Sequence, residues 1–348
     1  MNKVKIGDKF VGDGESSFIV LETSSTYTNL EEAKQMTKAA ADGGADAIKF
    51  QTFFPGESKR ILGDPTAQVD FSTPTGKKHE LMIDAIARRE LTQNEWIELM
   101  EYSKNLGLAF ISSPYFSNGV DFLFTHGADA LKVNKGDVNN SLLIQKMAIT
   151  NLPIIIDGRE KFEDVDKAIK ICQDAGNSNI IIMHCPSGYP AESSGIHLRS
   201  IPAIKEKYNF PVGFADHSIG GLMDFAAIAL GVNMIEKTIT PDKTTEQSEH
   251  YMSLEPNEIP DFIMDIRSIE NAMGNPDILK SSRVSEKMRR SFFTKIDIKI
   301  GEQITEEMLD YLRPENKGIS CSDGFKVLTK KASKDIPKNT FLQWDMLD

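Results

Sequence analysis

The stretch Asp46-Ala-Ile-Lys-Phe-Gln51 is a short, mostly apolar run that follows a helical pattern and the pair Gly43-Gly44. Such a run is typical of a parallel strand covered on both faces. The theme of apolar run, polar residue and amphipathic segment recurs through the first 240 residues, and the eight runs are Ser17–Leu21, Asp46–Gln51, Leu108–Ser112, Ala130–Asn134, Pro153–Asp157, Asn179–His184, Pro211–Ala215 and Asn233–Lys237. Eight strands alternating with helices predict an α/β fold of the (β/α)8 TIM-barrel type, with a doubly wound open sheet as the alternative.

The composition is that of a globular protein with an excess of acidic residues. The 348 residues carry a formal net charge of -11, which argues against a general nucleic-acid or anionic-membrane binder. The three cysteines form neither a disulfide framework nor a metal-binding CxxC pattern, which fits a reducing compartment. The sequence has no signal-peptide pattern and no membrane-spanning run. We therefore expect a cytoplasmic protein.

The last 60 residues differ in character from the rest. Asp297-Ile-Lys-Ile300 recurs 38 residues later as Asp335-Ile-Pro-Lys338, and each copy is followed by a Met-Leu pair. This weak duplication predicts a small domain of two related β-rich halves. We place the barrel domain at 1–275, a linker at 276–288 and the small domain at 289–348.

A polar insertion, Pro55–Lys78, follows the second predicted strand. Its length suits either a flap over a binding site or a solvated loop. The sequence leaves both interpretations open.

Two lysines lie inside apolar strands. Lys49 in Ala-Ile-Lys-Phe-Gln and Lys132 in Ala-Leu-Lys-Val-Asn are expensive to bury unless each meets an anion. Near the mouth of one barrel they would form an electropositive pocket for phosphate or carboxylate. The alternative is a buried network in which both lysines pair with Glu22, Asp157 or Glu236.

Other strand ends are polar as well. His217 follows Asp216 at the end of the seventh strand, and it suits either a metal ligand or a general base. His184 suits a structural role at least as well as direct chemistry. Cys185 is interpreted as a small core residue rather than a nucleophile.

These strand ends, taken in order, resemble the sialic acid synthase family, whose members make nonulosonic acids. The resemblance rests on Glu22, Ala47-Ile-Lys-Phe-Gln-Thr52, Ile111-Ser-Ser-Pro-Tyr115, Leu131-Lys-Val-Asn134, His184-Cys185 with Tyr189-Pro190, Asp216-His217-Ser218 and Ile235-Glu-Lys237. The tail, 289–348 with Arg313-Pro314, is similar to the antifreeze-like (SAF) domain that ends those enzymes.

The resemblance implies a metal-assisted condensation of phosphoenolpyruvate with an N-acetylated, open-chain amino sugar and release of phosphate. It implies a divalent metal, Mn or Mg, and a domain-swapped homodimer. The roles it implies are these: catalytic for Glu22, His217 and Glu236; phosphoenolpyruvate-binding for Lys49, Ser113, Lys132 and Lys135; sugar-binding for Gln51, Tyr189, Glu249 and Arg313; and metal-binding for His217.

The chain departs from the family pattern at several positions. The Asn-His pair that follows the first strand in the family is absent, and Thr26 and Tyr27 lie in this stretch. Thr238 replaces the second metal histidine, and Lys135, Asp157 and Ala215 replace small hydroxyl residues around the phosphate site. An oxygen-rich magnesium site using Asp157, Asp216 or Glu236 is one possibility that these changes leave open.

Two further hypotheses follow from these departures. One is a diverged paralogue with another donor or another carbonyl chemistry, such as a Schiff base on Lys135. The other is a non-catalytic sugar-binding subunit. The sequence does not specify which amino sugar a synthase of this kind would accept.

Overall fold

The structure is a computed structural model that describes residues 2–158, 161–274, 288–313 and 318–348. It divides into two compact units, Met1–Met273 and Gly274–Asp348. Most of the linker expected at 276–288 lies outside the described residues. None of the described helices combines the length and the apolar character needed to cross a membrane.

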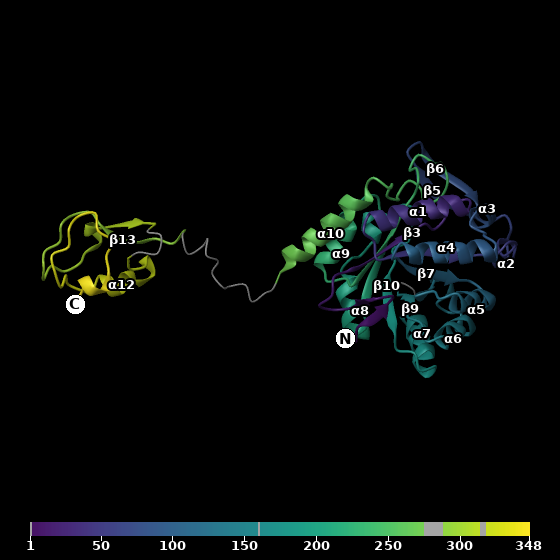
Figure 1. Cartoon of the computed structure of the whole chain (residues 1–348), viewed down its shortest axis with the longest axis horizontal. Coiled ribbons are helices and arrows are strands. Elements are labelled where there is room, and N and C mark those ends of the chain that lie inside the picture. Colours follow the sequence, from purple (N-terminus) through teal and green to yellow (C-terminus); the bar gives the residue numbers. More distant parts are fainter. Residues whose placement is uncertain (1, 159–160, 275–287, 314–317) are drawn as a thin grey trace. The chain divides into compact units, whose positions relative to one another are not determined.

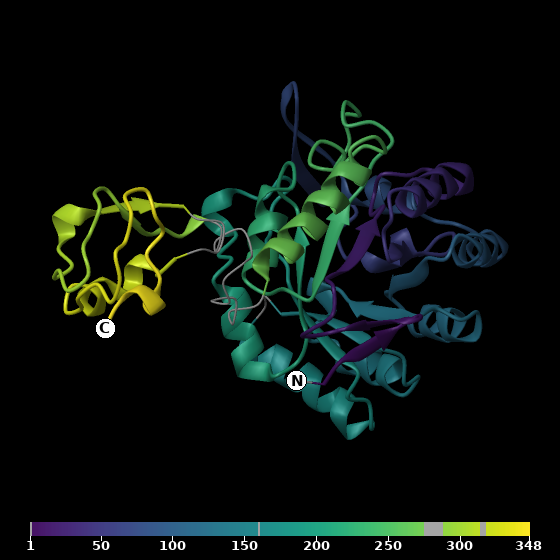
Figure 2. The same cartoon turned by 60° about the vertical axis from the view of Figure 1, so that its left-hand side comes forward.

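The first unit is a closed barrel of eight parallel strands, as the sequence predicts (Figures 1 and 2). The strands lie side by side in chain order, so the alternative of an open, doubly wound sheet is wrong. They are β3 (Phe18–Glu22), β4 (Ala47–Thr52), β7 (Ala109–Pro114), β8 (Ala130–Val133), β9 (Ile154–Asp157), β10 (Ile180–His184), β11 (Val212–Asp216) and β12 (Met234–Thr238). The helices between and after them are α1 (Leu30–Asp42), α4 (Gln93–Asn105), α5 (Ser117–Thr125), α6 (Ser141–Ala148), α7 (Phe162–Asp174), α8 (Ser200–Tyr208), α9 (Leu222–Ala229) and α10 (Ile259–Met273).

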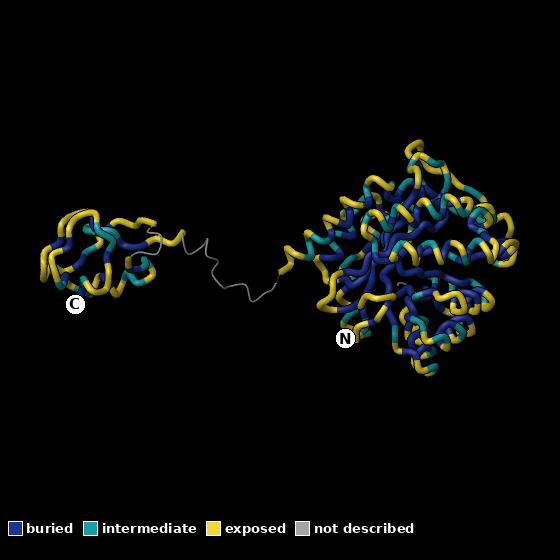
Figure 3. The backbone as a smooth tube through the Cα atoms, in the orientation of Figure 1, coloured by how far each residue is buried: buried dark blue, intermediate teal, exposed yellow. Residues whose placement is uncertain are grey.

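Alternate residues of each strand face the barrel interior and the helices. Phe18, Val20 and Ala47 belong to an interior cluster, whereas Ile19 and Ile48 pack with the surrounding helices. The hairpin β1 (Val4–Ile6) and β2 (Lys9–Val11) adds apolar side chains to the interior cluster, next to residues at the start of the strands. Figure 3 shows the barrel strands as the most deeply buried part of this unit. Polar side chains occupy the other end of the barrel, where strands end in residues such as Glu22, Asp157 and His184.

Local sequence signals fix where the helices begin and end. Thr92 and Glu95 form a capping box at the start of α4, in which each side chain bonds the other residue's backbone. Gly107 and Gly231, just past α4 and α9, have φ values of 79° and 83°. Those left-handed conformations suit glycine and let the chain turn into the next strand.

The insertion after β4 folds into α2 (Ser58–Ile61), the hairpin β5 (Gln68–Thr73) and β6 (Gly76–Leu81), and α3 (Met82–Ala87). Ser72 N donates to Tyr189 O (3.0 Å), and Ser248 N donates to Glu80 Oε1 (2.9 Å). The hairpin is therefore tied to two loops that leave the ends of barrel strands. Of the two interpretations left open, the flap is the one that the structure shows.

The second unit has two related halves, as the duplication predicts. Ile298 and Ile336 exchange two backbone hydrogen bonds of 2.9 and 2.8 Å. Each duplicated aspartate also crosses to the other half: Asp297 accepts from Lys338 N (2.7 Å), and Asp335 accepts from Ile300 N (2.9 Å). The only labelled helix and strands in its described part are β13 (Ser291–Thr294), β14 (Leu309–Leu312) and α12 (Gly324–Val327), beside short 3-10 turns.

Candidate active site

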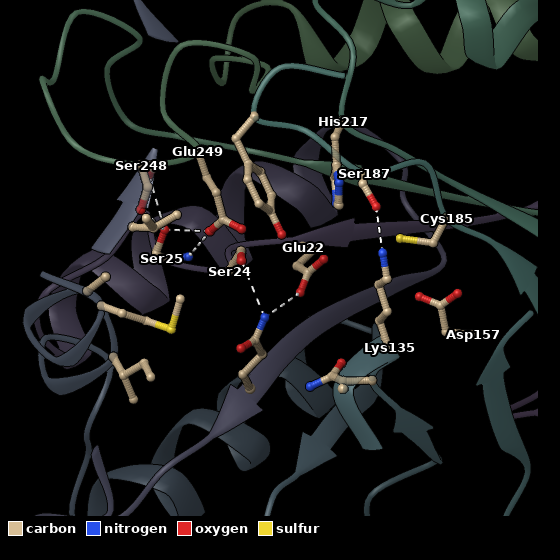
Figure 4. Close-up of a pocket in the computed structure, with 18 of the residues that line it drawn as sticks. Glu22, Ser24, Ser25, Lys135, Asp157, Cys185, Ser187, His217, Ser248 and Glu249 are labelled. Carbon is tan, nitrogen blue, oxygen red and sulfur yellow. Dashed lines mark hydrogen bonds between the residues drawn. The ribbon is translucent and has the colours of Figure 1, made fainter. Parts of the chain in front are cut away.

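A cavity of about 480 Å³ opens at the carboxyl ends of the barrel strands. Residues from β3, β4, β8, β9 and β12 line it, together with the loops after β10 and β11 and the flap (Figure 4). This is the end of a (β/α)8 barrel where active sites are found. Its volume suits one or two small molecules.

The two strand lysines meet at the floor of this cavity. Lys49 Nζ contacts Glu22 and lies 3.4 Å from Glu236 Oε1, and Lys132 Nζ binds the same Glu236 oxygen. Lys49 and Lys132 are 1% and 4% exposed, yet both line the cavity. The structure thus shows the buried network, in which the lysines pair with Glu22 and Glu236, and both lysines also line the pocket.

The charges of this network reinforce one another. Burial opposes ionisation of Glu22, but the Lys49 and Lys132 cations outweigh it and hold the pKa of this carboxyl at about 2. Burial works against the charge of Lys132, but Glu236, Cys185, Glu22 and Asp157 together raise its pKa. Glu22 is thus a carboxylate and Lys132 a cation at neutral pH. Lys132 does not act as an amine nucleophile in this state.

Two polar atoms near the network are buried without a hydrogen-bond partner. They are Glu236 Oε2 and His217 Nδ1. The His217 ring lies with its centroid 5.0 Å from that of Tyr189, and both residues line the cavity. An unpaired buried polar atom is costly, so a donor or acceptor that reached either atom would relieve this cost.

A second group of side chains lies on another side of the pocket. Figure 4 shows Lys135, Asp157, Cys185 and Ser187 together there, and Lys135 Nζ donates to Ser187 Oγ (2.6 Å). Burial, with the negative charge of Asp157, raises the pKa of the Cys185 thiol well above its ordinary value. Cys185 is therefore a protonated thiol that lines the cavity, not an activated nucleophile.

The sequence interpretation missed a buried arginine. Arg89 Nη1 donates to Gln51 Oε1 (2.7 Å), which also accepts from the Tyr115 hydroxyl (2.8 Å). The hydroxyl of Tyr115 accepts from Asn134 Nδ2 (2.6 Å). Arg89 follows the short helix α3 in the flap segment, where no periodicity distinguishes a buried arginine from an exposed one. Its contact with Gln51 of β4 could be found only from the fold.

Ser113, which the resemblance assigns to phosphoenolpyruvate, lies outside the lining of the cavity. Its hydroxyl is fully buried and donates to Asn134 Oδ1 (2.9 Å), and the residue is not part of the cavity lining. In this structure the Ser113 hydroxyl therefore positions Asn134 and does not face the cavity. Ala215, Asp216 and Thr238 also lie outside the lining.

Glu249 lies at the far side of the pocket from Lys135. Its Oε2 accepts from Ser25 N (2.8 Å) and from the Ser25 hydroxyl. Glu249 and Ser24 both have positive φ, 72° and 39°, which non-glycine residues rarely adopt. Two strained backbone positions at one wall indicate a surface shaped for a ligand. Ser24, Ser25 and Ser248 line this wall without having been assigned a role from the sequence.

Two further sequence predictions have different outcomes. His184 has a structural role, because its Nε2 bonds Ile196 O (2.6 Å) and its ring stacks on Phe214. Arg313 is exposed in the second unit, after β14, and its assignment to the sugar site stays a prediction.

The expected metal is not matched by a set of protein ligands. No group of three or more His, Cys, Asp or Glu side chains suited to one ion occurs in the described part of the chain. His217 Nδ1 and Glu236 Oε2 are unpaired, but Glu236 Oε1 already binds two lysines, and Asp216 faces away from the pocket toward Lys237. A protein site for Mn or Zn needs about three such donors. We therefore derive no chemical step through a metal.

The pocket is not the electropositive one that two lysines alone suggest. Four cations line it, Lys49, Arg89, Lys132 and Lys135, and so do five carboxylates, Glu22, Asp137, Asp157, Glu236 and Glu249. The expectation failed because the two strand lysines are buried together with the carboxylates of Glu22 and Glu236 that compensate their charge. The arrangement is a mixed one, in which an anionic ligand would compete with carboxylates for the lysines.

Comparison with known proteins identifies the setting of this pocket. A model described as the NeuB family matches residues 36–277, and one described as the SAF domain matches 289–348. The chain is similar to the N,N'-diacetyllegionaminic acid synthase of Campylobacter jejuni, with 31% identity over 94% of this chain and 99% of the relative. It is also similar to the pseudaminic acid synthase of the same species, with 32% identity over 92% and 93%.

Solved structures agree with these matches. The structure of an N-acetylneuraminic acid synthetase from Leptospira borgpetersenii, in complex with citrate, covers 82% of this chain and 95% of its own, with a TM-score of 0.72 and 25% identity. The Bacillus subtilis spore coat polysaccharide biosynthesis protein SpsE covers 100% and 99%, with a TM-score of 0.67 and 26% identity.

Proposed function

Because the chain belongs to the NeuB family, we propose that it condenses phosphoenolpyruvate with an N-acetylated, open-chain amino sugar to give a nonulosonic acid and phosphate. The observation that carries this proposal is the pair of buried lysines at the floor of the pocket. Lys49 and Lys132 are paired with Glu22 and Glu236, and both line the cavity. They would bind the phosphate and carboxylate of the donor.

The reaction forms one carbon–carbon bond and one carbon–oxygen bond, the latter between C2 and water, and it breaks the carbon–oxygen bond between C2 and the phosphate. The C3 atom of the enolpyruvate attacks the sugar aldehyde, whose oxygen takes a proton. Water adds at C2, and phosphate leaves with its bridging oxygen. Lys132 stays charged because carboxylates raise its pKa, so it can stabilise negative charge on a substrate oxygen.

The acidic residues take different parts in this scheme. Glu22 remains ionised because the lysines keep its pKa low, so it orients Lys49 and does not supply a proton. The unpaired Nδ1 of His217 is the atom that would take the proton from the attacking water. Gln51, Tyr189 and Glu249 line the cavity and would contact the sugar. The divalent metal, the domain-swapped homodimer and the cytoplasmic location stay predictions.

Calorimetric titration of phosphoenolpyruvate into the full chain tests the donor half of this proposal. It should be run on metal-free protein and again with Mn²⁺ or Mg²⁺. We expect saturable binding in both cases, and little enhancement by metal because the described ligand set is incomplete. Phosphate release on adding an amino sugar would then establish the reaction. Absence of binding under every condition would contradict the proposal, and strong dependence on metal would support the metal prediction.

A second candidate is supported by Lys135 and Asp157, which replace the hydroxyl residues of the family. They give the pocket a mixed charge that would also suit a carbonyl donor without phosphate. In that case Lys135 would form a Schiff base with the donor carbonyl. Borohydride treatment with pyruvate, followed by mass spectrometry, would detect a reduced adduct on Lys135. If no adduct forms, this candidate fails.

A further inference from the structure

Arg89 is a buried cation of the pocket that the proposed reaction does not use. It is 8% exposed and lines the cavity, and its Nε donates to Ala85 O (3.0 Å) within the flap segment. Lys49 and Lys132 pair with carboxylates, but no carboxylate oxygen lies within 4.0 Å of the Arg89 guanidinium in the described part of the chain. Its Nη1 instead donates to the amide oxygen of Gln51 (2.7 Å). Charge balance therefore does not explain this arginine.

Gln51 lies at one end of a chain of hydrogen bonds that links four polar side chains. The Ser113 hydroxyl bonds Asn134 Oδ1 (2.9 Å), and Asn134 Nδ2 bonds the Tyr115 hydroxyl (2.6 Å). That hydroxyl in turn bonds Gln51 Oε1 (2.8 Å). Hydroxyl and amide groups can each donate and accept. Taken alone, the four side chains could therefore be bonded in either direction, with both amides turned over and both hydroxyl protons moved.

Arg89 removes this freedom, because a guanidinium can donate hydrogen bonds but cannot accept them. Gln51 has to turn its oxygen toward Arg89, so its Nε2 faces Glu22 Oε1 and Ser24 Oγ, each 3.4 Å away. Both contacts are longer than the usual N–H···O distance of about 2.9–3.0 Å, so the N–H groups of the amide retain capacity for a ligand. A reversed amide would set its oxygen against the Glu22 carboxylate, with two acceptors facing each other.

We propose that Arg89 is a positioning residue, which fixes the Gln51 amide so that its N–H groups face the cavity and donate to an oxygen of the sugar substrate. Arg89 belongs to the flap segment and Gln51 to β4, so the correct orientation of this amide requires the flap to be docked. This inference rests on the proposed function, because it treats the ligand beside Gln51 as the amino sugar of the condensation. It adds a residue that acts on the sugar through Gln51 and does not act on phosphoenolpyruvate.

A double-mutant cycle tests whether Arg89 acts through Gln51. The parent, Arg89→Met, Gln51→Met and the double variant would be assayed for phosphate release from phosphoenolpyruvate, with N-acetylmannosamine and with a diacetamido-trideoxyhexose. For the sugar that the parent converts, we expect Gln51→Met to raise KM about 10-fold, as for one lost hydrogen bond, and Arg89→Met to raise it several-fold. The kcat and the KM for phosphoenolpyruvate should change less than about 2-fold, because the contact is one of substrate binding. The double variant should be no worse than Gln51→Met, since Arg89 then has no amide to orient.

Further variants separate the amide orientation from other effects of the substitutions. Gln51→Glu keeps an oxygen for Arg89 but loses the N–H groups, so it should raise the KM for the sugar at least as much as Gln51→Met. Arg60→Met is the matched control, because Arg60 lies in the same flap segment, pairs with Glu57 and has a side chain that is 60% exposed. It should leave the KM for the sugar unchanged. If Arg89→Met does not fold, Arg89→Gln replaces it in the cycle, because glutamine can accept as well as donate and so also removes the fixed direction.

The outcomes distinguish this inference from the proposed function. Additive effects of the two substitutions, an equal rise in KM for both substrates, or an unchanged KM for the sugar in the Arg89 variant would overturn the inference and leave the synthase reaction standing. A Gln51→Glu variant that binds the sugar as the parent does would also overturn it, because the N–H groups would then not be needed. If the parent releases phosphate with neither sugar, the proposed function itself is contradicted, and the inference that rests on it falls as well.

Discussion

Strand β12 carries two buried charged residues in succession, and they face opposite sides of the barrel wall. Glu236 points into the barrel and binds Lys132 and Lys49. Lys237 points outward, binds Asp216, donates to Ser218 O (2.8 Å) and lies 3.3 Å from Asp224 Oδ2. The exposed fractions of the two side chains are 3% and 1%, so burial does not distinguish them.

What distinguishes the two clusters is access to the cavity. The inner cluster of Glu22, Lys49, Lys132 and Glu236 lines the pocket, whereas Asp216, Asp224 and Lys237 line no part of it. The outer cluster instead holds the chain on either side of His217, since Asp216 accepts from Ser218 N (2.9 Å) and from the Ser218 hydroxyl (2.8 Å). A buried lysine is therefore evidence of a binding site only when a cavity reaches it.

Lys237→Met should have the largest effect of the predicted changes, a decrease in the free energy of unfolding. Removing this cation leaves the buried Asp216 carboxyl without its ion-pair partner, which typically costs about 3–5 kcal/mol. Urea unfolding would measure the loss in free energy of unfolding. Lys170→Met is the matched control, because Lys170 pairs with Asp174 on the surface with exposed fractions of 72% and 63%. Such pairs contribute about 0–1 kcal/mol. Similar losses in the two variants would contradict the structural role of the outer cluster.

Lys132→Met should decrease stability less than Lys237→Met does, but it should strongly weaken phosphoenolpyruvate binding. Glu236 would keep Lys49 at 3.4 Å and could be reached by water in the cavity, so the folding penalty should be below that of Lys237→Met. Phosphoenolpyruvate binding should weaken by roughly 2–5 kcal/mol, the usual cost of removing one partner from a buried charged contact. Lys49→Met should behave in the same way. Unchanged calorimetric affinity in both folded variants would remove these lysines from the donor site.

The sequence was sufficient for the barrel because each strand is a separate, locally readable apolar run. The strand bounds agree within one or two residues, and the register of β4 with β7 aligns Lys49 with Ile111 as parallel neighbours. The duplication in the tail was equally readable, because the paired Asp-Ile segments carry the same residues. Chain order alone does not show whether eight strands close, and the barrel rather than the open sheet is settled by the pairing of β3 with β12.

The site was predictable where function depends on strand position and less so where it depends on loops. Glu22, Lys49, Lys132 and Glu236 were found because strand periodicity sends alternate residues inward. Arg89 was missed because the flap segment has no such periodicity, and Ser24 was missed because it lies in the loop after β3. Ser113 was assigned to the phosphoenolpyruvate site from its inward direction. That direction does not show that its hydroxyl is bonded to Asn134. The mixed charge of the pocket required knowing which carboxylates reach which lysines.

The outer cluster holds two aspartates beside one lysine, and the smallest predicted effect concerns which of them is ionised. Burial, together with the negative charge of Asp216, raises the pKa of Asp224 well above its ordinary value despite the opposing charge of Lys237. Neither oxygen of Asp224 accepts a hydrogen bond among the described residues. We therefore expect Asp224 to be protonated and Asp216 to be the partner of Lys237.

At acidic pH, Asp224→Asn should consequently change the free energy of unfolding by less than about 1 kcal/mol, because asparagine resembles the protonated acid. A carboxyl whose pKa is raised on folding binds its proton more tightly in the folded state. Its contribution is complete below the unfolded pKa and is lost as pH rises toward the folded pKa, at up to about 1.4 kcal/mol per pH unit. The parent should thus lose stability relative to Asp224→Asn as pH rises above the ordinary aspartate pKa of about 4. Glu22, with its pKa lowered to about 2, changes its contribution to stability only below about pH 4.5, so it does not affect this comparison.

Asp216→Asn should instead be destabilising across this pH range, since it removes the ion-pair partner of Lys237. If urea unfolding gives parallel pH profiles for the parent and Asp224→Asn, Asp224 is not the proton-bearing member of the cluster.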